Sequence, residues 1–310
     1  MRSLVLGGCG FIGSHLVRRL ARDEAEIKVL DLGPSLHHPE EPGCAYLYGS
    51  WQDSSLLSEA LEGVSCVYHL IGTVQLAQAN EHPAEDLQRT GVDSVRLLEA
   101  CVSHAVKRVV YVSSGGAVYG LPRTVPIAED HPTEPISAHG ISKLAVEKYL
   151  RLFAHLHGLE HQIARCSNPY GEWQDPLRGQ GAAVALLWRT LRREPVSIWG
   201  DGSVVRDYVY VGDVADALAR LGTHPEPNRI FNVGSGVGTS LIDLLGAIAR
   251  VAGLDPIVQY AEARQFDVQM NVLDVTSLQR ATGWCPSVQL EEGLRRTQAW
   301  LEDFGRGKSA

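Results

Sequence analysis

The sequence has no long apolar run and no excess of positive charge. Its opening segment, residues 1–6, passes directly into a glycine-rich loop, so we expect neither a signal peptide nor a membrane span. The formal net charge of -8 argues against nucleic acid or an anionic membrane as the main partner, because both bind basic surfaces. Local arginines can still bind a small polyanion. We therefore expect a cytoplasmic protein.

Cysteine pairs, low-complexity tracts and internal repeats are also absent from the sequence. The six cysteines are scattered without a CxxC pair, which favours reduced thiols over disulfides or metal ligands. His155, His157 and His161 are interrupted by Gly158, which is expected to end a helix, so we expect no metal site. At 310 residues and 45% hydrophobic content, the chain can form a large globular core.

Short apolar runs alternate with helical patterns along the chain, as in a parallel sheet covered by helices on both faces. We expect strands at 3–6, 28–31, 66–70, 109–112, 162–165, 196–199, 206–211 and 230–233. We expect helices at 14–22, 54–61, 86–104, 139–158, 182–193, 241–252 and 291–304. The pattern becomes less regular after Asn168. This predicts an α/β fold with a smaller C-terminal lobe.

A glycine-rich loop lies between the first expected strand and the first expected helix. Gly7, Gly10 and Gly13 allow a tight turn, a close approach of the backbone to a pyrophosphate, and packing of helix on strand. Asp31 ends the second strand, where a carboxylate can accept hydrogen bonds from an adenosine ribose. Its charge would repel a 2′-phosphate, so NAD is favoured over NADP. The alternatives are a purely structural glycine turn and a turn-forming aspartate.

His139 and Lys143 lie four residues apart and therefore on one helix face. Three further motifs are Val118-Tyr119-Gly120, the segment 165–171 (RCSNPYG) and the segment 206–211 (RDYVYV). In this order and spacing, and over residues 1 to about 300, the chain resembles an extended short-chain dehydrogenase/reductase of the NAD-dependent nucleotide-sugar epimerase/dehydratase family. The resemblance implies a Rossmann-type doubly wound parallel sheet with a smaller C-terminal substrate-binding lobe.

The resemblance also implies a division of the chain and a role for each matching residue. Residues 1–167 would bind NAD, with 205–235 returning to that domain, and 168–204 with 236–310 would form the lobe that binds a UDP-linked sugar. Lys143 would bridge the nicotinamide ribose hydroxyls. The other cofactor contacts would be Gly7, Gly10, Phe11, Ile12, Gly13, Asp31, Trp51, Leu70 and Ser113. Asn168 and Arg206 would hold the diphosphate, Gln180, Ser197 and Trp199 the nucleobase, and Arg264 and Asp267 the nucleoside. For the arginines, the alternative is a solvated surface charge.

The departures from the family pattern fall around the reacting groups. His139 stands where the family carries tyrosine, and Gly115 stands where it carries serine or threonine, with Ser114 as the neighbouring candidate hydroxyl. Thr90 replaces an asparagine and Ser50 an aspartate. No carboxylate directly precedes Val118, which argues against the sugar dehydratases and decarboxylating relatives. An epimerase needs only oxidation at C4, rotation of the keto sugar and return of the hydride.

Histidine can do the work of the tyrosine if it remains neutral. Imidazole has a reference pKa of about 6.5 against about 10 for a phenol, and the positive charges of Lys143 and of an oxidised nicotinamide would disfavour its protonation. Our hypothesis is that His139 is the general acid/base of C4 epimerisation. The small Asn271 would leave space for an N-acetyl group. The alternatives are a protein that binds both ligands without turnover and a 4-keto-sugar reductase.

The resemblance further implies a homodimer formed through helices 86–104 and 139–153. Leu87, Val95, Leu98, Leu144 and Leu150 could supply its apolar contacts. The alternative is that these side chains face the sheet.

Overall fold

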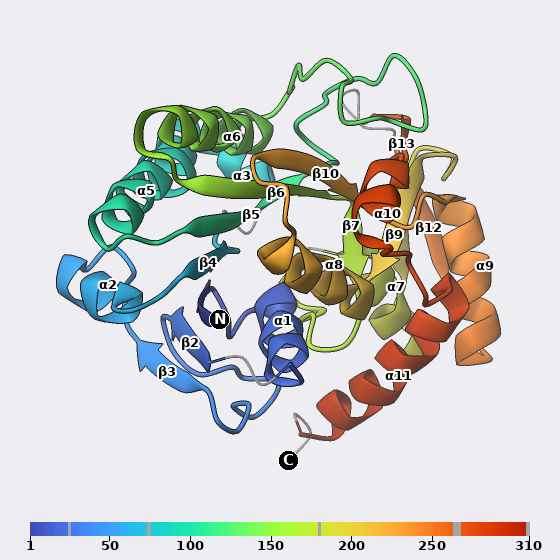
Figure 1. Ribbon diagram of the computed structural model, residues 1–310. Coiled ribbons are helices and arrows are strands. Elements are labelled where there is room, and N and C mark those ends of the chain that lie inside the picture. The colour runs from blue at the N-terminus through green and yellow to red at the C-terminus, as the bar shows by residue number, and fades with distance from the viewer. Residues whose placement is uncertain (24–25, 73–75, 179–180, 263–267, 308–310) are drawn as a thin grey trace.

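The computed structural model describes residues 1–23, 26–72, 76–178, 181–262 and 268–307, and is shown in Figure 1. Its centre is a seven-stranded sheet in the order β10-β6-β5-β4-β1-β2-β3, with parallel pairing throughout. The strands are β1 (Arg2–Leu6), β2 (Glu26–Asp31), β3 (Ala45–Tyr48), β4 (Cys66–His69), β5 (Arg108–Ser114), β6 (Glu160–Cys166) and β10 (Arg229–Val233).

Helices cover both faces of this sheet. Because side chains alternate along a strand, Val5 and Val29 face one core, while Leu4, Leu6 and Leu30 face the other. The first core is closed by α1 (Phe11–Ala21) and α8 (Val211–Thr223), and the second by α2 (Ser54–Leu61), α5 (Asp93–Ser103) and α6 (Ala138–His157). The prediction of a doubly wound parallel sheet is therefore confirmed.

A second lobe is built mainly from the later part of the chain and lies to the right in Figure 1. Its larger sheet joins β7 (Asn168–Tyr170), β9 (Val205–Tyr210), β11 (Gly238–Ser240) and β13 (Met270–Asn271), and its smaller sheet pairs β8 (Val196–Trp199) with β12 (Val258–Ala261). A separate core forms against α7 (Ala182–Leu191), α9 (Leu241–Ala252) and α11 (Leu290–Gly307). Among the described residues, no helix is long and apolar enough to cross a membrane.

Part of the expected element pattern is wrong. The expected helix 86–104 is divided into α4 (Pro83–Asp86), a π-helical segment η1 (Leu87–Val92) and α5. The helices α3 (Leu76–Glu81), α8 and α10 (Thr276–Thr282) were not expected, and neither were the short strands β3, β7, β11, β12 and β13. These strands have two to four residues and few buried side chains, so neither an apolar run nor an alternation marks them in the sequence.

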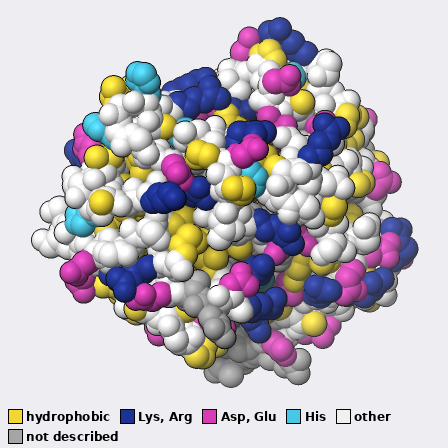
Figure 2. Space-filling view, viewed as in Figure 1, with side chains coloured by type: hydrophobic (Ala, Val, Ile, Leu, Met, Phe, Trp, Pro, Cys, Tyr) yellow, Lys and Arg dark blue, Asp and Glu magenta, His cyan; other side chains and the backbone are white. Residues whose placement is uncertain are grey.

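The segment 205–235 is shared between the two sheets. Its strand β9 pairs with β7, β11 and β13 in the second lobe, whereas β10 pairs with β6 in the large sheet. Conversely, α10 contacts β10, and Leu278 and Trp284 are buried in the first core of the large sheet. On the face shown in Figure 2, basic and acidic side chains are interspersed.

Candidate active site

The glycine loop joins β1 to α1 with no room for side chains at its closest approach. A Cβ atom at Gly13 would lie 2.1 Å from the carbonyl oxygen of Gly7, and Gly7 itself has a φ of +80°. Gly10 precedes α1 without a side-chain cap, so the first backbone N–H groups of the helix face the loop without a competing side chain. Phe11 and Ile12 pack against the core of the second lobe. This geometry can hold a pyrophosphate.

Asp31 lies directly beside the glycine loop. One carboxylate oxygen accepts a hydrogen bond of 2.9 Å from the backbone N–H of Cys9, and the other accepts one of 2.8 Å from Leu32. The structure thus brings the end of β2 and the loop after β1 together at the carboxyl edge of the sheet. Ligands bind at this edge in open α/β folds.

Leu70 follows β4 and Trp51 follows β3, two strands of the large sheet that are separated by β1 and β2. The N–H of Leu70 donates to the carbonyl oxygen of Leu6, which continues the pairing of β4 with β1, and the ring of Trp51 lies 5.5 Å from that of His69.

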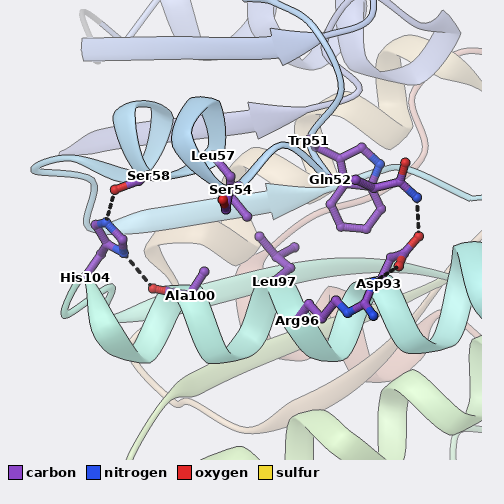
Figure 3. A pocket seen from close by; sticks show the side chains of 10 residues that line it. All are labelled: Trp51, Gln52, Ser54, Leu57, Ser58, Asp93, Arg96, Leu97, Ala100 and His104. Carbon is purple, nitrogen blue, oxygen red and sulfur yellow. Dashed lines mark hydrogen bonds and ion pairs between the residues drawn. The ribbon is translucent and has the colours of Figure 1, made fainter.

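Trp51 also lines a pocket of about 280 Å³ between α2 and α5 (Figure 3). The other end of that pocket is formed by Ser58 and His104, whose side chains lie 2.8 Å apart. This pocket is lined only by residues 51–58 and 93–104, so it is separate from α6.

The start of α6 is fixed from three directions. Ser137 accepts a hydrogen bond of 3.2 Å from the N–H of Gly140, and Asn80 on α3 accepts one of 2.9 Å from Ala138. A Cβ atom at Gly140 would lie 2.6 Å from the carbonyl oxygen of Ala117, so the helix passes close to the loop after β5. These contacts set the position of His139, which lies between Ala138 and Gly140.

Lys143 is 5% exposed and points at the end of β5. Its Nζ donates a hydrogen bond of 2.9 Å to the carbonyl oxygen of Val112 and lies 4.9 Å from the centre of the Tyr111 ring. His139 is partly buried one turn earlier, and its Nδ1 is inaccessible and makes no hydrogen bond to the described residues. Proton exchange with a ligand would therefore use Nε2.

Burial controls the charge of both side chains. It lowers the pKa of Lys143 to about 8, against the opposing effects of Cys166, Asp86 and Glu147. Burial, followed by repulsion from Lys143, lowers the pKa of His139 to about 4, and Asp86 acts in the opposite direction. At neutral pH, the site therefore holds a charged lysine and a neutral histidine, as acid/base chemistry at His139 requires.

The loop after β5 explains why no side chain stands at position 115. A Cβ atom at Gly115 would lie 2.6 Å from Cδ1 of the buried Leu273, which therefore occupies that space. Ser114 is partly buried at the end of β5. Ser113 is buried, and its hydroxyl donates a hydrogen bond of 2.6 Å to Glu147. The Ser113 hydroxyl therefore bonds to a buried side chain. A contact from Ser113 to the expected cofactor would have to come from its backbone.

Residues of the second lobe reach the same edge. Asn271 is 2% exposed, and its Nδ2 donates a hydrogen bond of 3.1 Å to the carbonyl oxygen of Gly115. Asn271 is also paired in register with Arg206, whose guanidinium donates to the carbonyl oxygens of Val205 and Val268. Asn168 donates to the backbone of Asp207, one residue along β9.

Two other expected residues lie farther along the lobe. Ser197 and Trp199 occupy alternate positions on the same exposed face of β8. Gln180, Arg264 and Asp267 lie outside the described residues.

Several interior charges were missed by sequence reasoning. Glu147, one helical turn after Lys143, forms a buried ion pair of 2.7 Å with Arg165, and its spacing of four residues was the available signal. Asp207, in the segment 206–211, accepts hydrogen bonds from the N–H groups of Ser235, Gly236 and Leu273. Asp86 is 2% exposed at the end of α4, and nothing in the local pattern marked it.

A cluster of rings joins α1 to the second lobe. The ring of Trp173 lies 4.2 Å from that of His15 and 4.6 Å from that of His38, and His15 contacts the backbone of Glu172 at 3.1 Å. His38 also contacts the hydroxyl of Ser14 beside the glycine loop. Burial lowers the pKa of His15 to about 4, so its ring is uncharged at neutral pH, and the guanidinium of Arg18 lies 5.8 Å from the centre of the Trp173 ring.

Comparison with known proteins agrees with this geometry. The sequence model of the NAD dependent epimerase/dehydratase family matches residues 3–234. The UDP-glucose 4-epimerase of Mycolicibacterium smegmatis is 36% identical over the whole of both chains. The crystal structure of the Thermotoga maritima UDP-glucose 4-epimerase with UDP-glucose has a TM-score of 0.91 and 35% identity, covering 99% of this chain and 100% of that one.

A second solved structure bears on the cofactor. The Thermus thermophilus UDP-glucose 4-epimerase in complex with NAD has a TM-score of 0.90 and 35% identity, covering 97% of this chain and 99% of that one. The predictions of an epimerase and of NAD as its cofactor are confirmed. The chain belongs to the NAD dependent epimerase/dehydratase family.

Proposed function

We propose that this protein inverts C4 of a UDP-linked hexose or N-acetylhexosamine through a 4-keto intermediate, with His139 as the acid/base. One observation carries the proposal. A neutral histidine lies one helical turn from a buried, charged lysine, at the sheet edge that also holds the glycine loop. Inversion needs a group that takes a proton from the C4 hydroxyl and later returns it, which neutral imidazole can do.

The residues present fit NAD. The loop is closely packed, because a Cβ atom at Gly13 would lie 2.1 Å from the carbonyl oxygen of Gly7, and the uncapped start of α1 suits an anion. Asp31 has lone pairs for a ribose diol and would repel a 2′-phosphate. Phe11, Ile12, Trp51, Leu70 and Lys143 complete the proposed contacts, whereas Ser113 contributes through its backbone because its hydroxyl is bonded to Glu147. NAD, when bound, supplies the acceptor for the C4 hydride.

The chain's own residues then handle the proton and the charge. Nε2 of His139 accepts the C4 hydroxyl proton and returns it after the keto sugar has rotated. Lys143, held at Val112, supplies a fixed positive charge beside the ribose and the sugar oxygen. Ser114 is the candidate hydroxyl in place of the missing side chain at Gly115.

We assign the sugar nucleotide to the second lobe and to the end of β5, which residues of that lobe contact. Asn168 and Arg206 are proposed to bind the diphosphate, since Arg206 presents several donors in one plane. Ser197 and Trp199, with Gln180, Arg264 and Asp267, are assigned to the nucleoside. Asn271 contacts the backbone of Gly115, and its short side chain favours acceptance of an N-acetyl group.

We also propose a homodimer formed by α6 and η1. The stripe of exposed apolar side chains comprises Leu87, Val92, Ile141, Tyr149, Leu152 and Leu156. Leu98 and Leu150 are 1% exposed and face the sheet, so the expectation that they form the contact is wrong. Light scattering should give twice the monomer mass, and Leu152→Glu should lower it, whereas Glu99→Gln on the exposed side of α5 should not.

Turnover tests the function directly. Purified protein is incubated with NAD and a panel of UDP-sugars, and the C4 epimers are separated by chromatography, with Lys143→Met as the inactive reference. Epimer formation without net formation of NADH from the added NAD supports the proposal. Net consumption of NADH in a second mixture, which contains NADH and a UDP-linked 4-keto sugar, would indicate a reductase. Binding without any product, followed by activity in His139→Tyr, would indicate a protein that has lost the reaction.

A further inference from the structure

The segment that follows Asp31 is held against the start of α1 by His38. Nε2 of His38 contacts the hydroxyl of Ser14, which directly follows the glycine loop. A carbonyl oxygen can only accept, so the contact of 2.7 Å between Nδ1 of His38 and the oxygen of Pro39 places a proton on Nδ1. Burial lowers the pKa of His38, so the ring is neutral at pH 7 and its Nε2 accepts from Ser14.

Trp173, in the segment after β7, packs against this histidine from the side of the second lobe. The centre of its ring lies 4.6 Å from that of His38 and 4.2 Å from that of His15 on α1. His15 is fixed in turn, because its Nε2 donates a hydrogen bond of 3.1 Å to the carbonyl oxygen of Glu172. These three rings, called the ring cluster below, join α1, the segment after β2 and the segment after β7.

The backbone of Trp173 has a conformation that bulky residues rarely adopt. Its φ is +67°, in the left-handed region where the Cβ atom crowds the following carbonyl oxygen. Such strain persists only where the surrounding contacts hold the residue in place, and it recurs at ligand clamps and switch regions. The contacts of the Trp173 ring therefore stabilise an otherwise unfavourable backbone.

His37, the residue before His38, makes a second contact with the second lobe. Its ring lies 5.5 Å from that of Phe304 and 5.9 Å from that of Trp300, both on α11. Its Nε2 lies 3.7 Å from the carboxylate of Asp175. Two adjacent residues thus contact two separate parts of the second lobe, and the segment after β2 can move away from the glycine loop only if these contacts break.

An epimerase has to keep its cofactor between two half-reactions. In the first, the C4 hydride moves to NAD and the C4 hydroxyl proton moves to His139, which leaves NADH and a 4-keto sugar. In the second, both return to the opposite face of the sugar. Loss of NADH between the two would remove the hydride and release the 4-keto sugar, so slow release of the cofactor is a requirement of the reaction.

Resting on the function proposed above, we infer that Trp173 is a positioning residue that slows the release of NAD and NADH. Its ring holds His38, and with it the segment that follows Asp31, the carboxylate assigned to the adenosine ribose. The second lobe, to which we assign the sugar nucleotide, thereby helps to retain the cofactor through side chains that do not touch the reacting atoms.

The experiment compares Trp173→Ala with Leu177→Ala, which removes an exposed side chain from the same segment. Each protein is loaded with NAD that carries ¹⁴C in its adenine, excess unlabelled NAD is added, and the retained label is counted after desalting at successive times. We expect Trp173→Ala to release NAD about tenfold faster than the wild type or more, because two ring contacts are lost. Leu177→Ala should release it at the wild-type rate.

Trp173→Phe separates the ring from the backbone. Alanine and phenylalanine both carry a Cβ atom, so the strain at the positive φ is the same in the two variants and only the ring differs. Its rate of NAD release should lie between those of the wild type and Trp173→Ala.

Turnover gives a measurement that a general loss of stability would not imitate. With Trp173→Ala, saturating NAD and a UDP-sugar that the wild type epimerises, we expect free NADH to accumulate together with an equal amount of 4-keto sugar. The free NADH is separated by ultrafiltration and measured by its fluorescence. The KM for the UDP-sugar should change little.

Each result decides the inference. A wild-type rate of NAD release from folded Trp173→Ala would overturn it, as would an equal increase in Leu177→Ala or complete retention of NADH during turnover. If Trp173→Ala does not fold, His38→Ala is measured with the same expectations. Failure of the wild-type protein to turn over any UDP-sugar would refute the proposed function. An active wild type with unchanged NAD release from Trp173→Ala refutes only this inference.

Discussion

The glycine loop before α1 and the sheet edge facing α6 both belong to the proposed site, but we expect them to tolerate substitution differently. At the loop, a Cβ atom on Gly13 would overlap the backbone of Gly7, and the family pattern is intact. At the sheet edge, His139 and Gly115 stand where the resemblance implies a tyrosine and a serine or threonine, and Leu273 fills the space beside Gly115. The close backbone contact at Gly13 admits only glycine, whereas more than one type of side chain can take up and return a proton.

Adding a methyl group at Gly13 should prevent the glycine loop from binding NAD. Gly13→Ala places a carbon 2.1 Å from the Gly7 carbonyl oxygen, so the turn must open and we expect the loss of bound NAD. NAD released by heating is measured per chain, together with the unfolding temperature. Gly33→Ala is the matched control, because nothing lies within 4 Å of its added carbon. Wild-type NAD content in Gly13→Ala would contradict the steric account of the loop.

At the sheet edge, we expect activity to depend more on the charge of Lys143 than on its side-chain volume. Lys143→Met preserves most of the side-chain volume but removes the buried cation, and we expect kcat to fall by about 10² to 10⁴. Lys148→Met, on the exposed side of the same helix, should retain activity. The epimer assay on both variants checks the prediction. Equal losses in the two variants would point to damage to the helix rather than to the charge.

The same contrast explains how much could be predicted from sequence. The glycine loop, Asp31 and the Lys143 helix are set by local spacing, and the fold and cofactor predicted from them are confirmed. Contacts that join distant segments left no local signal. Asn271 meets Gly115 across 156 positions, and Leu273, two residues after β13, fills the space beside Gly115. The π-helical segment η1 also left no signal in the sequence, because the spacing of its apolar residues is that of an ordinary α-helix.

The pH dependence of kcat should report the titration of His139 and of Lys143 separately. His139 must be neutral, so activity should fall as the pH drops through about 4, and Lys143 must be charged, so activity should fall as the pH rises through about 8. Beyond each limit, we expect about a tenfold loss of kcat per pH unit. In Lys143→Arg, the residual activity should lose its alkaline limb, because a guanidinium stays charged. Constant wild-type activity from pH 7 to 10 would show that Lys143 titrates outside this range.

The smallest effect is expected for a substitution at Gly115. Gly115→Ser adds the hydroxyl that the resemblance implies at this position but places its Cβ 2.6 Å from Leu273, so we expect a loss of about 1–3 kcal/mol in the free energy of unfolding. Leu273→Ala alone should also destabilise the protein, by about 2–5 kcal/mol, because Leu273 is fully buried. Combined, the two changes should cost less than their sum, since the smaller side chain admits the serine. Additive costs in urea unfolding would mean that Leu273 is not what excludes a side chain at position 115.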